Sequence, residues 1–289
     1  LKRRDPSVKH LWAHQADLLR SYQKTSPSCK DLALELPTGA GKTLGGLLIS
    51  EYRRQAHGER VIYVCPTRQL VNQVVYEANE KYNLPAVALM PPEYDGINKY
   101  RMGTHIGVCT YSAIFNTNPR INDPQSIVLD DAHAGEQFIA DLWSLTIRQE
   151  KYPRLYKNIL KFFSEQFETA VLQTFMGRDL IDVNRAFCTM IPPHIVWQDI
   201  QGIRDLIDEN IQGKTDEIYP WRMVRNSLHA CCFYVSRDEI LIRPVIPPTC
   251  LHDAFSNASQ RIYMSATLGR GGELERITGV KSIERLSMP

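Results

Sequence analysis

The residues with the clearest chemical potential form a short glycine-bearing segment, residues 35–43, which reads Glu-Leu-Pro-Thr-Gly-Ala-Gly-Lys-Thr. It lies between an apolar run and a periodic apolar segment, an order that predicts strand, loop and helix. In that setting backbone N–H groups and a helix N-terminus bind phosphate. Lys42 would bring positive charge to the phosphates and Thr43 a hydroxyl to Mg²⁺, although Leu36 stands where the general pattern has its first glycine. The predicted nucleotide-binding residues of this loop are Thr38, Gly39, Ala40, Gly41, Lys42 and Thr43.

A second group with catalytic potential follows the apolar run at residues 126–129 and reads Asp-Asp-Ala-His. A carboxylate at the end of a buried strand can hold Mg²⁺ directly or through water, so we assign Asp130 to the metal together with Thr43. Asp131 is placed to orient an attacking water molecule. Two aspartates after a strand can also form an ordinary solvated turn. Because a phosphate loop precedes them, we interpret Lys42, Asp130, Asp131 and His133 as the catalytic group.

Alternating strands and helices are predicted to position these groups. The strand candidates are residues 31–36, 60–66, 85–90, 105–110 and 126–130, and the helix candidates are 11–24, 42–57, 68–82 and 111–116. Such alternation predicts a parallel sheet flanked by helices. Ligands then bind at the carboxyl ends of the strands, which is where both groups lie.

Taken with a third segment, these groups resemble the motifs of superfamily 2 helicases. Residues 37–43 match motif I, residues 130–133 match motif II, and Ser-Ala-Thr at 265–267 matches motif III. Weaker matches are residues 65–73 to motif Ia, 108–113 to a later Thr-bearing motif, and 11–15 to the adenine-reading Gln segment. The resemblance implies a RecA-like P-loop NTPase domain that uses ATP and Mg²⁺.

The resemblance also implies roles for individual residues. Gln15 would bond the adenine, while Ser265 and Thr267 would couple the γ-phosphate to the nucleic-acid side. The nucleic-acid contacts would be Thr67, Arg68, Thr110 and Tyr111. Arg68 could equally be a solvated surface charge. For Trp12, three residues before Gln15, packing in the core is the favoured interpretation over a contact with the adenine.

One departure from the family pattern bears on catalysis. Motif II usually reads Asp-Glu, whereas here Asp131 takes the second place and is one methylene shorter. We expect an active site in which hydrolysis can be slower.

Residues 134–250 differ from the rest of the chain. Helical apolar spacing runs through residues 138–152, 155–170, 172–187 and 196–211, before a predicted β-hairpin at 230–235 and 239–243. We therefore expect a mainly helical insertion between motifs II and III, and a RecA-like domain made of residues 1–133 with 251–289. The insertion could be purely structural, contact nucleic acid or receive a partner protein.

A helical arch at this position is similar to the XPD/DinG-like branch of superfamily 2. That branch carries an iron–sulfur module with four cysteines between motifs I and II. Only Cys65 and Cys109 lie there, so we predict no iron–sulfur cluster. The resemblance also implies a second RecA-like domain with an arginine finger, which we expect beyond Pro289 in a longer protein.

Composition narrows the class of protein but not its partner. The 289 residues are 43% hydrophobic and 23% charged, as in globular domains, and no apolar run approaches the roughly 20 residues that span a bilayer. The net charge of +2 does not by itself indicate that the protein binds nucleic acid. Seven scattered cysteines fit reduced thiols, and thus a cytoplasmic location, or a nuclear one in a eukaryote.

The sequence therefore predicts an ATP-dependent helicase or translocase on single-stranded nucleic acid, with DNA favoured over RNA. Two alternatives use the same motifs: a motor subunit of a restriction or antiphage system without strand separation, and an ATP-dependent clamp with weak turnover. A metabolite kinase would leave motifs Ia, II and III without an explanation.

Overall fold

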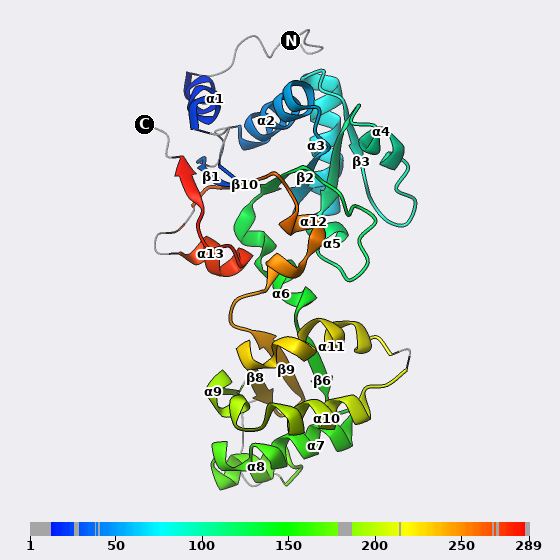
Figure 1. Ribbon diagram of the computed structural model, residues 1–289, viewed down its shortest axis with the longest axis vertical. Coiled ribbons are helices and arrows are strands. Elements are labelled where there is room, and N and C mark those ends of the chain that lie inside the picture. Colours follow the sequence, from blue (N-terminus) through cyan, green and yellow to red (C-terminus); the bar gives the residue numbers. More distant parts are fainter. Residues whose placement is uncertain are drawn as a thin grey trace. The chain divides into compact units, whose positions relative to one another are not determined.

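The computed structural model describes residues 13–25, 29–37, 39, 41–178, 187–213, 215–267, 269 and 272–286. The chain divides into two compact units (Figure 1). Unit 1 comprises residues 1–139 with 248–289, and unit 2 comprises residues 140–247.

Unit 1 is built on a seven-stranded sheet in the order β11-β1-β10-β5-β2-β4-β3, with parallel pairing at every step. The strands are β1 (Asp31–Glu35), β2 (Val61–Cys65), β3 (Ala86–Ala88), β4 (Ile106–Thr110), β5 (Ser126–Asp130), β10 (Gln260–Ser265) and β11 (Glu284–Leu286). The predicted parallel sheet of a RecA-like domain is confirmed. All strands end at one edge, which we call the carboxyl edge.

Helices flank this sheet. They are α1 (Ala13–Thr25), α2 (Lys42–His57), α3 (Arg68–Tyr76), α4 (Ile97–Arg101), α5 (Tyr111–Ile114), α6 (Glu136–Leu142), α12 (Asp253–Ser256) and α13 (Glu273–Thr278). Helix α2 ends at Gly58, which adopts the left-handed conformation and donates its N–H to the Arg53 carbonyl. The hydroxyl of Thr67 caps α3 by accepting from the N–H of Leu70 at 3.2 Å.

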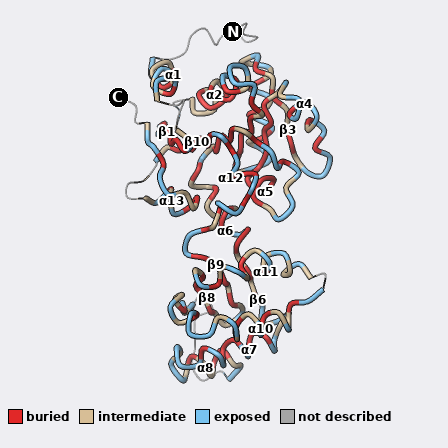
Figure 2. Tube along the Cα trace, in the orientation of Figure 1, coloured by how far each residue is buried: buried red, intermediate tan, exposed pale blue. Residues whose placement is uncertain are grey.

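The core of unit 1 explains why its strands β2 and β4 carry no charged residue. Every residue of β2 and β4 is buried, because helices cover the sheet (Figure 2). Helix α2 lies so close to the sheet that a Cβ at Gly46 would stand 2.6 Å from the Met264 Cε and 2.8 Å from the Tyr63 Cε2. Glycine at position 46 thus sets the distance between α2 and the strands.

Strands β5 and β10 lie side by side, although residues 131–259 separate them in sequence. Leu129 is opposite Tyr263, and Asp130 is opposite Met264. The whole of unit 2 therefore belongs to the connection between two neighbouring parallel strands.

Unit 2 contains a four-stranded antiparallel sheet in the order β6-β9-β8-β7. Its strands are β6 (Leu145–Arg148), β7 (Cys188–Ile191), β8 (Cys231–Ser236) and β9 (Glu239–Pro244). Its helices are α7 (Pro153–Phe162), α8 (Thr169–Phe175), α9 (Pro193–Val196), α10 (Ile200–Asn210) and α11 (Ile218–Val224). The predicted hairpin is present as β8 and β9.

The helices predicted in unit 2 were wrong in part. The helix expected over 155–170 is divided, because α7 ends at Phe162, Phe167 is extended and α8 begins only at Thr169. The helix expected over 138–152 ends at Leu142, and β6 follows at once. Leu145 and Ile147 are buried while Thr146 and Arg148 are not, so the true period is two residues. Over four residues that alternation is too short to stand out from helical spacing. The helix expected over 172–187 corresponds to α8, which ends at Phe175, and most of its remainder lies outside the described residues.

None of the described helices combines the length and the apolar character that crossing a lipid bilayer requires.

Candidate nucleotide and nucleic-acid site

The phosphate-loop candidate joins the end of β1 to the start of α2, as the sequence predicted. Gly41 precedes the helix with φ 76°, and Gly39 has φ 82°; both angles lie in the left-handed region that favours glycine. A Cβ at Gly41 would also collide with the Gln15 amide nitrogen. The local backbone therefore requires glycine at position 41. Thr38 and Ala40 lie outside the described residues.

Gln15 is held against this loop from helix α1. Its side chain is buried, and its amide packs on Gly41. Sequence reasoning chose Gln15 by resemblance alone, and the structure adds the physical contact. Trp12 and the side chain of His14 lie outside what the structure describes.

Asp130 ends β5 and lies close to Lys42. Burial raises the pKa of the Asp130 carboxyl, while the Tyr63 hydroxyl and the Lys42 charge lower it and the Asp131 charge raises it. Because the net shift is upward, burial of the Asp130 carboxyl outweighs the Tyr63 hydroxyl and the Lys42 charge, which favour its ionised form. The two side chains that were predicted to meet across the triphosphate are thus electrostatic neighbours.

Tyr63 is a neighbour of the site that sequence reasoning missed. It is fully buried in β2, and its hydroxyl has no hydrogen-bond partner among the described residues. Burial and the Asp130 carboxylate raise the pKa of Tyr63 well above its usual value, while the Thr43 hydroxyl acts in the opposite direction. A tyrosine two residues before the end of a buried strand was the only signal available in the sequence.

The residues beside Tyr63 fit Mg²⁺ chemically. Asp130 raises the pKa of the Tyr63 hydroxyl and Thr43 lowers it, so both oxygen-bearing side chains are neighbours of that hydroxyl. Mg²⁺ is typically held by one or two such protein groups, with phosphates and water completing its shell. In the described ranges, no three His, Cys, Asp or Glu side chains gather to hold a metal ion. The predicted absence of an iron–sulfur cluster remains a prediction.

Asp131 adopts an unusual backbone conformation. Its φ and ψ are 49° and 64°, in the left-handed region that few non-glycine residues occupy. Aspartate tolerates this region better than most residues, but the conformation persists only where its surroundings enforce it. Asp131 is exposed, and a short helical turn, Ala132–Gly135, begins directly after it.

The predicted coupling residues contact motif II. The ring Nδ1 of His133 lies 3.1 Å from the Ser265 hydroxyl, so a hydrogen bond links the two segments. The N–H of Thr267 points at the same hydroxyl oxygen at 3.4 Å. Ser265 is buried and Thr267 is exposed, so this contact extends from the interior to the surface.

The four predicted nucleic-acid residues separate into two pairs. Thr67 and Arg68 are exposed at the carboxyl edge, and the Arg68 guanidinium donates to the Pro91 carbonyl at 2.8 Å. Thr110 is buried, and its hydroxyl lies 3.1 Å from that of Ser112. Tyr111 is fully buried and presents no side-chain surface to a ligand. Its hydroxyl instead donates to the Asp130 carbonyl at 3.0 Å.

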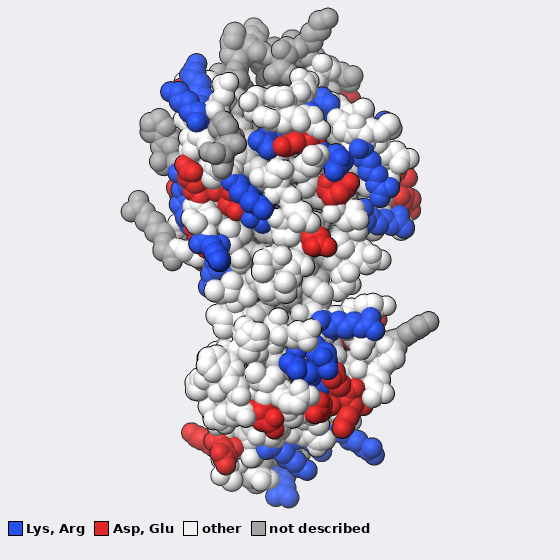
Figure 3. Space-filling view, viewed as in Figure 1, with Lys and Arg blue, Asp and Glu red and all other residues white. Residues whose placement is uncertain are grey.

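The visible surface does not carry a broad basic field. Figure 3 shows basic and acidic side chains interspersed on this face of each unit. A nucleic-acid grip on the face that Figure 3 shows would therefore depend on hydroxyls, backbone N–H groups and a few arginines.

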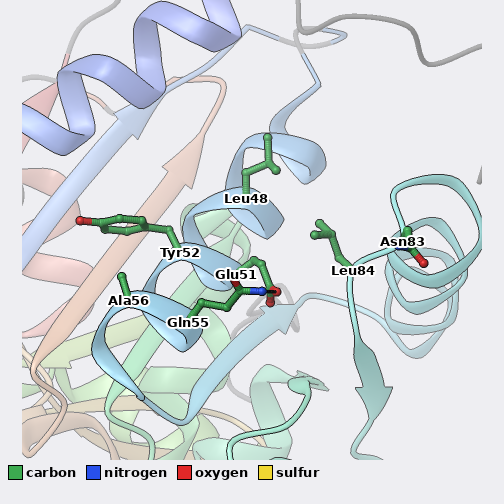
Figure 4. Close-up of a pocket in the computed structure, with 7 residues that line it drawn as sticks. All are labelled: Leu48, Glu51, Tyr52, Gln55, Ala56, Asn83 and Leu84. Atoms are coloured by element: carbon green, nitrogen blue, oxygen red, sulfur yellow. Dashed lines mark hydrogen bonds between the residues drawn. The ribbon is translucent and has the colours of Figure 1, made fainter. Parts of the chain in front are cut away.

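A separate hollow of about 610 Å³ lies beside the later turns of α2. Figure 4 shows its lining residues, which are Leu48, Glu51, Tyr52, Gln55, Ala56, Asn83 and Leu84. Lys42 and Thr43 occupy the first turn of the same helix and do not line it. This hollow is not the predicted nucleotide site.

Comparisons with known proteins agree with this geometry. The family model of the DEAD/DEAH box helicases matches residues 13–183, more than half of the chain. The chain therefore belongs to the DEAD/DEAH box helicase family, which confirms the predicted resemblance. No curated protein matches it.

Solved structures of XPD helicases share the fold. An XPD helicase structure matches with a TM-score of 0.52 and 16% identity, covering 96% of this chain and 62% of the other. Xpd4 from S. tokodaii matches with a TM-score of 0.51 and 15% identity, covering 89% and 57%. An apo XPD structure matches with a TM-score of 0.52 and 17% identity, covering 94% and 56%. The chain thus spans about three fifths of the length of these structures.

Proposed function

We propose that this chain is the ATP-binding part of a motor that moves along single-stranded nucleic acid. The observation that carries the proposal is that Lys42, which begins α2 after β1, and Asp130, which ends β5, lie at the same edge of one parallel sheet with only β10 between their strands. There the Lys42 charge lowers the pKa of the Asp130 carboxyl. A phosphate-binding lysine and a metal-binding carboxylate must face one triphosphate from two strands of one sheet. Membership of the helicase family supports the same conclusion.

Each candidate side chain has a specific task in this proposal. Lys42 and the loop N–H groups bind the β- and γ-phosphates, and Gln15 donates to or accepts from the adenine. Thr43 and Asp130 hold Mg²⁺, which supplies charge stabilisation to the phosphates when bound. Asp131 accepts a hydrogen bond from the attacking water and fixes its direction.

Coupling to nucleic acid follows from the His133–Ser265 bond. Any shift of His133 with the state of the γ-phosphate would reach Ser265 and then the exposed Thr267. Thr67 and Arg68 would bind backbone phosphates without reading sequence. We favour DNA over RNA because the sequence motifs resemble the XPD/DinG-like branch.

A second RecA-like domain would complete the motor by supplying an arginine to the transition state. This chain spans about three fifths of the XPD structures, so the proposal places that domain outside it. The isolated chain is then expected to bind ATP weakly and to hydrolyse it slowly or not at all.

One observation favours a second candidate, an ATP-dependent clamp with weak turnover. Asp131 is shorter than the glutamate of the family pattern, and its left-handed backbone limits where its carboxylate can reach. Single-turnover hydrolysis with Asp131→Ala as the reference separates the two functions. In a motor, Asp131→Ala should remove most of the rate of ATP hydrolysis. In a clamp, the rate should change little, because the unmodified protein already hydrolyses ATP slowly.

The direct test uses ATP hydrolysis by the full-length natural protein, with and without single-stranded DNA or RNA. We expect stimulation by nucleic acid, and Lys42→Ala should reduce hydrolysis by roughly 100-fold or more, as loss of a preorganised charge does in other active sites. Lys151→Ala is the matched control, because that lysine forms an ion pair with Glu217 in unit 2. Full ATP affinity in Lys42→Ala would refute the proposed site.

A further inference from the structure

Tyr111 connects the two chemical regions of unit 1 through its hydroxyl. It begins α5 directly after Thr110, the last residue of β4. Its hydroxyl donates to the backbone carbonyl of Asp130, at the end of β5, with a distance of 3.0 Å. One buried side chain therefore joins the predicted nucleic-acid segment to the predicted metal-binding residue.

The ring of Tyr111 is fixed in place on several sides. It stacks on Phe138 at 5.9 Å with 12° between the planes, and on Phe115 at 6.4 Å with 16°. A Cβ at Gly135 would collide with the ring, so the backbone there approaches as closely as it can. Packing on these sides holds the ring in one orientation, so the position of its hydroxyl follows that of the surrounding backbone.

The acceptor of this bond belongs to the peptide between Asp130 and Asp131. That peptide must rotate if Asp131 is to leave its left-handed conformation, whose φ is 49°. A hydrogen bond from a fixed donor to the carbonyl of this peptide opposes the rotation. The bond thus helps to hold a strained residue whose side chain is predicted to orient water.

We propose that Tyr111 is a positioning residue, which holds the Asp130–Asp131 peptide in its catalytic orientation and links it to the Thr110–Ser112 segment, where the exposed Ser112 can meet a nucleic-acid strand. Strand binding that tightens the Thr110–Ser112 segment would move the start of α5 and hence the tyrosine. The consequence is a nucleic-acid-dependent change in the placement of Asp131. This inference rests on the proposed function.

The test is Tyr111→Phe, which removes the hydroxyl and keeps the packed ring. In the full-length natural protein we expect the KM for ATP to stay within about twofold. The kcat at saturating single-stranded DNA should fall by up to about tenfold, the kinetic equivalent of one neutral hydrogen bond. Basal hydrolysis should fall less, so the stimulation ratio should drop as well.

The matched control is Tyr156→Phe in unit 2. Tyr156 is also fully buried, and its hydroxyl donates to the Ser236 carbonyl at 2.6 Å. This variant removes the same kind of bond, so a general loss of stability would appear in both proteins. Only Tyr111→Phe should change kcat and the stimulation ratio.

Amide hydrogen exchange tests the positioning role without hydrolysis. Tyr111→Phe should speed exchange in residues 130–135 by up to about tenfold, the equilibrium equivalent of that bond, and Tyr156→Phe should leave it unchanged.

Gly135→Ala, which pushes on the same ring, should reproduce the kinetic effect if Tyr111→Phe does not fold. Unchanged exchange and unchanged kcat in Tyr111→Phe would overturn the inference. A wild-type protein without nucleic-acid-stimulated hydrolysis would overturn the proposed function instead, and exchange would still decide the role of Tyr111.

Discussion

The two units solve different problems with different sheets. In unit 1 all strands are parallel, so Thr110, Asp130 and Ser265 end at one edge although they are far apart in sequence. In unit 2 neighbouring strands run in opposite directions, so their ends alternate between two edges. A parallel sheet therefore collects chemical groups in a way that an antiparallel sheet does not.

The units also differ in how they hold charge. Unit 1 buries ionic groups, as in the pair of Arg53 with Glu59, whose side chains are 8% and 10% exposed. In unit 2 the Arg225–Asp208 pair is 38% and 35% exposed. Burial makes a charge sensitive to each neighbour, whereas solvent screens it at the surface. Charge changes in the buried pairs of unit 1, such as Arg53 with Glu59, should therefore alter stability more than changes in exposed pairs.

The largest expected effect on stability tests the close approach in unit 1. Gly46→Ala forces a methyl group against Tyr63 and Met264 and should lower the free energy of unfolding by about 2 kcal/mol. Gly45→Ala is its control in the same helix, because its nearest neighbour is Leu18 at 3.5 Å. There alanine should gain up to about 1 kcal/mol from helix propensity. Equal effects in urea unfolding, followed by circular dichroism, would show that α2 does not pack as described.

A smaller effect of opposite sign is expected at the candidate metal site. The pKa of Asp130 is raised by burial, so the folded protein holds this proton more tightly than the unfolded chain does. The ionised carboxylate thus destabilises the fold increasingly as pH rises from the unfolded pKa through the raised folded pKa. Asp130→Asn should raise the stability of the nucleotide-free protein by about 1 kcal/mol at pH 7, and by little near pH 4.

Thermal unfolding of both proteins between pH 4 and pH 8 measures this difference. A gain that is the same at all pH values would mean that ionisation of Asp130 is not its cause. The same variant should lose Mg²⁺-dependent ATP binding, which distinguishes a functional carboxylate from a structural one.

The smallest effect is expected in unit 2. The Arg225 guanidinium, more than Trp221, lowers the pKa of Asp208 by hydrogen bonding. This group therefore stabilises the fold above its unfolded pKa, and the contribution is lost as pH falls through the lowered folded pKa. Because solvent screens the pair, Asp208→Asn should cost only about 0.5 kcal/mol at pH 7.

Tryptophan fluorescence is the suitable probe, since Trp143, Trp197 and Trp221 all lie in unit 2. High salt should reduce the difference between the two proteins further. A loss above about 2 kcal/mol would place this ion pair with the buried pairs of unit 1 and would weaken the comparison.

How far the sequence predicted the structure also differs between the units. Strands β2 and β4 are buried on both faces, so their composition alone identifies them. Strands β6 and β7 have exposed residues and only four positions each, so their pattern is not distinctive. Local periodicity predicts long, fully buried elements and fails for short, half-exposed ones.

The same limit applies to the candidate site. Lys42 and Asp130 lie at the same edge because both follow strands of one parallel sheet, which the alternation of strands and helices predicted. The contributions of Tyr63 and Tyr111 depend on the position of each tyrosine hydroxyl in the folded protein, and the spacing of residues in the sequence does not predict that position. The left-handed backbone of Asp131 was equally hidden, because aspartate is common in ordinary turns.

The connection from β5 to β10 has a thermodynamic consequence. Closing a flexible loop costs entropy that grows only with the logarithm of its length, so a tenfold longer connection adds roughly 2 kcal/mol. An inserted module that folds by itself and holds its two ends at a fixed separation reduces even that penalty. The connection between two neighbouring parallel strands is thus a position at which a new module can be inserted with a small loss of conformational entropy and without disturbing the sheet.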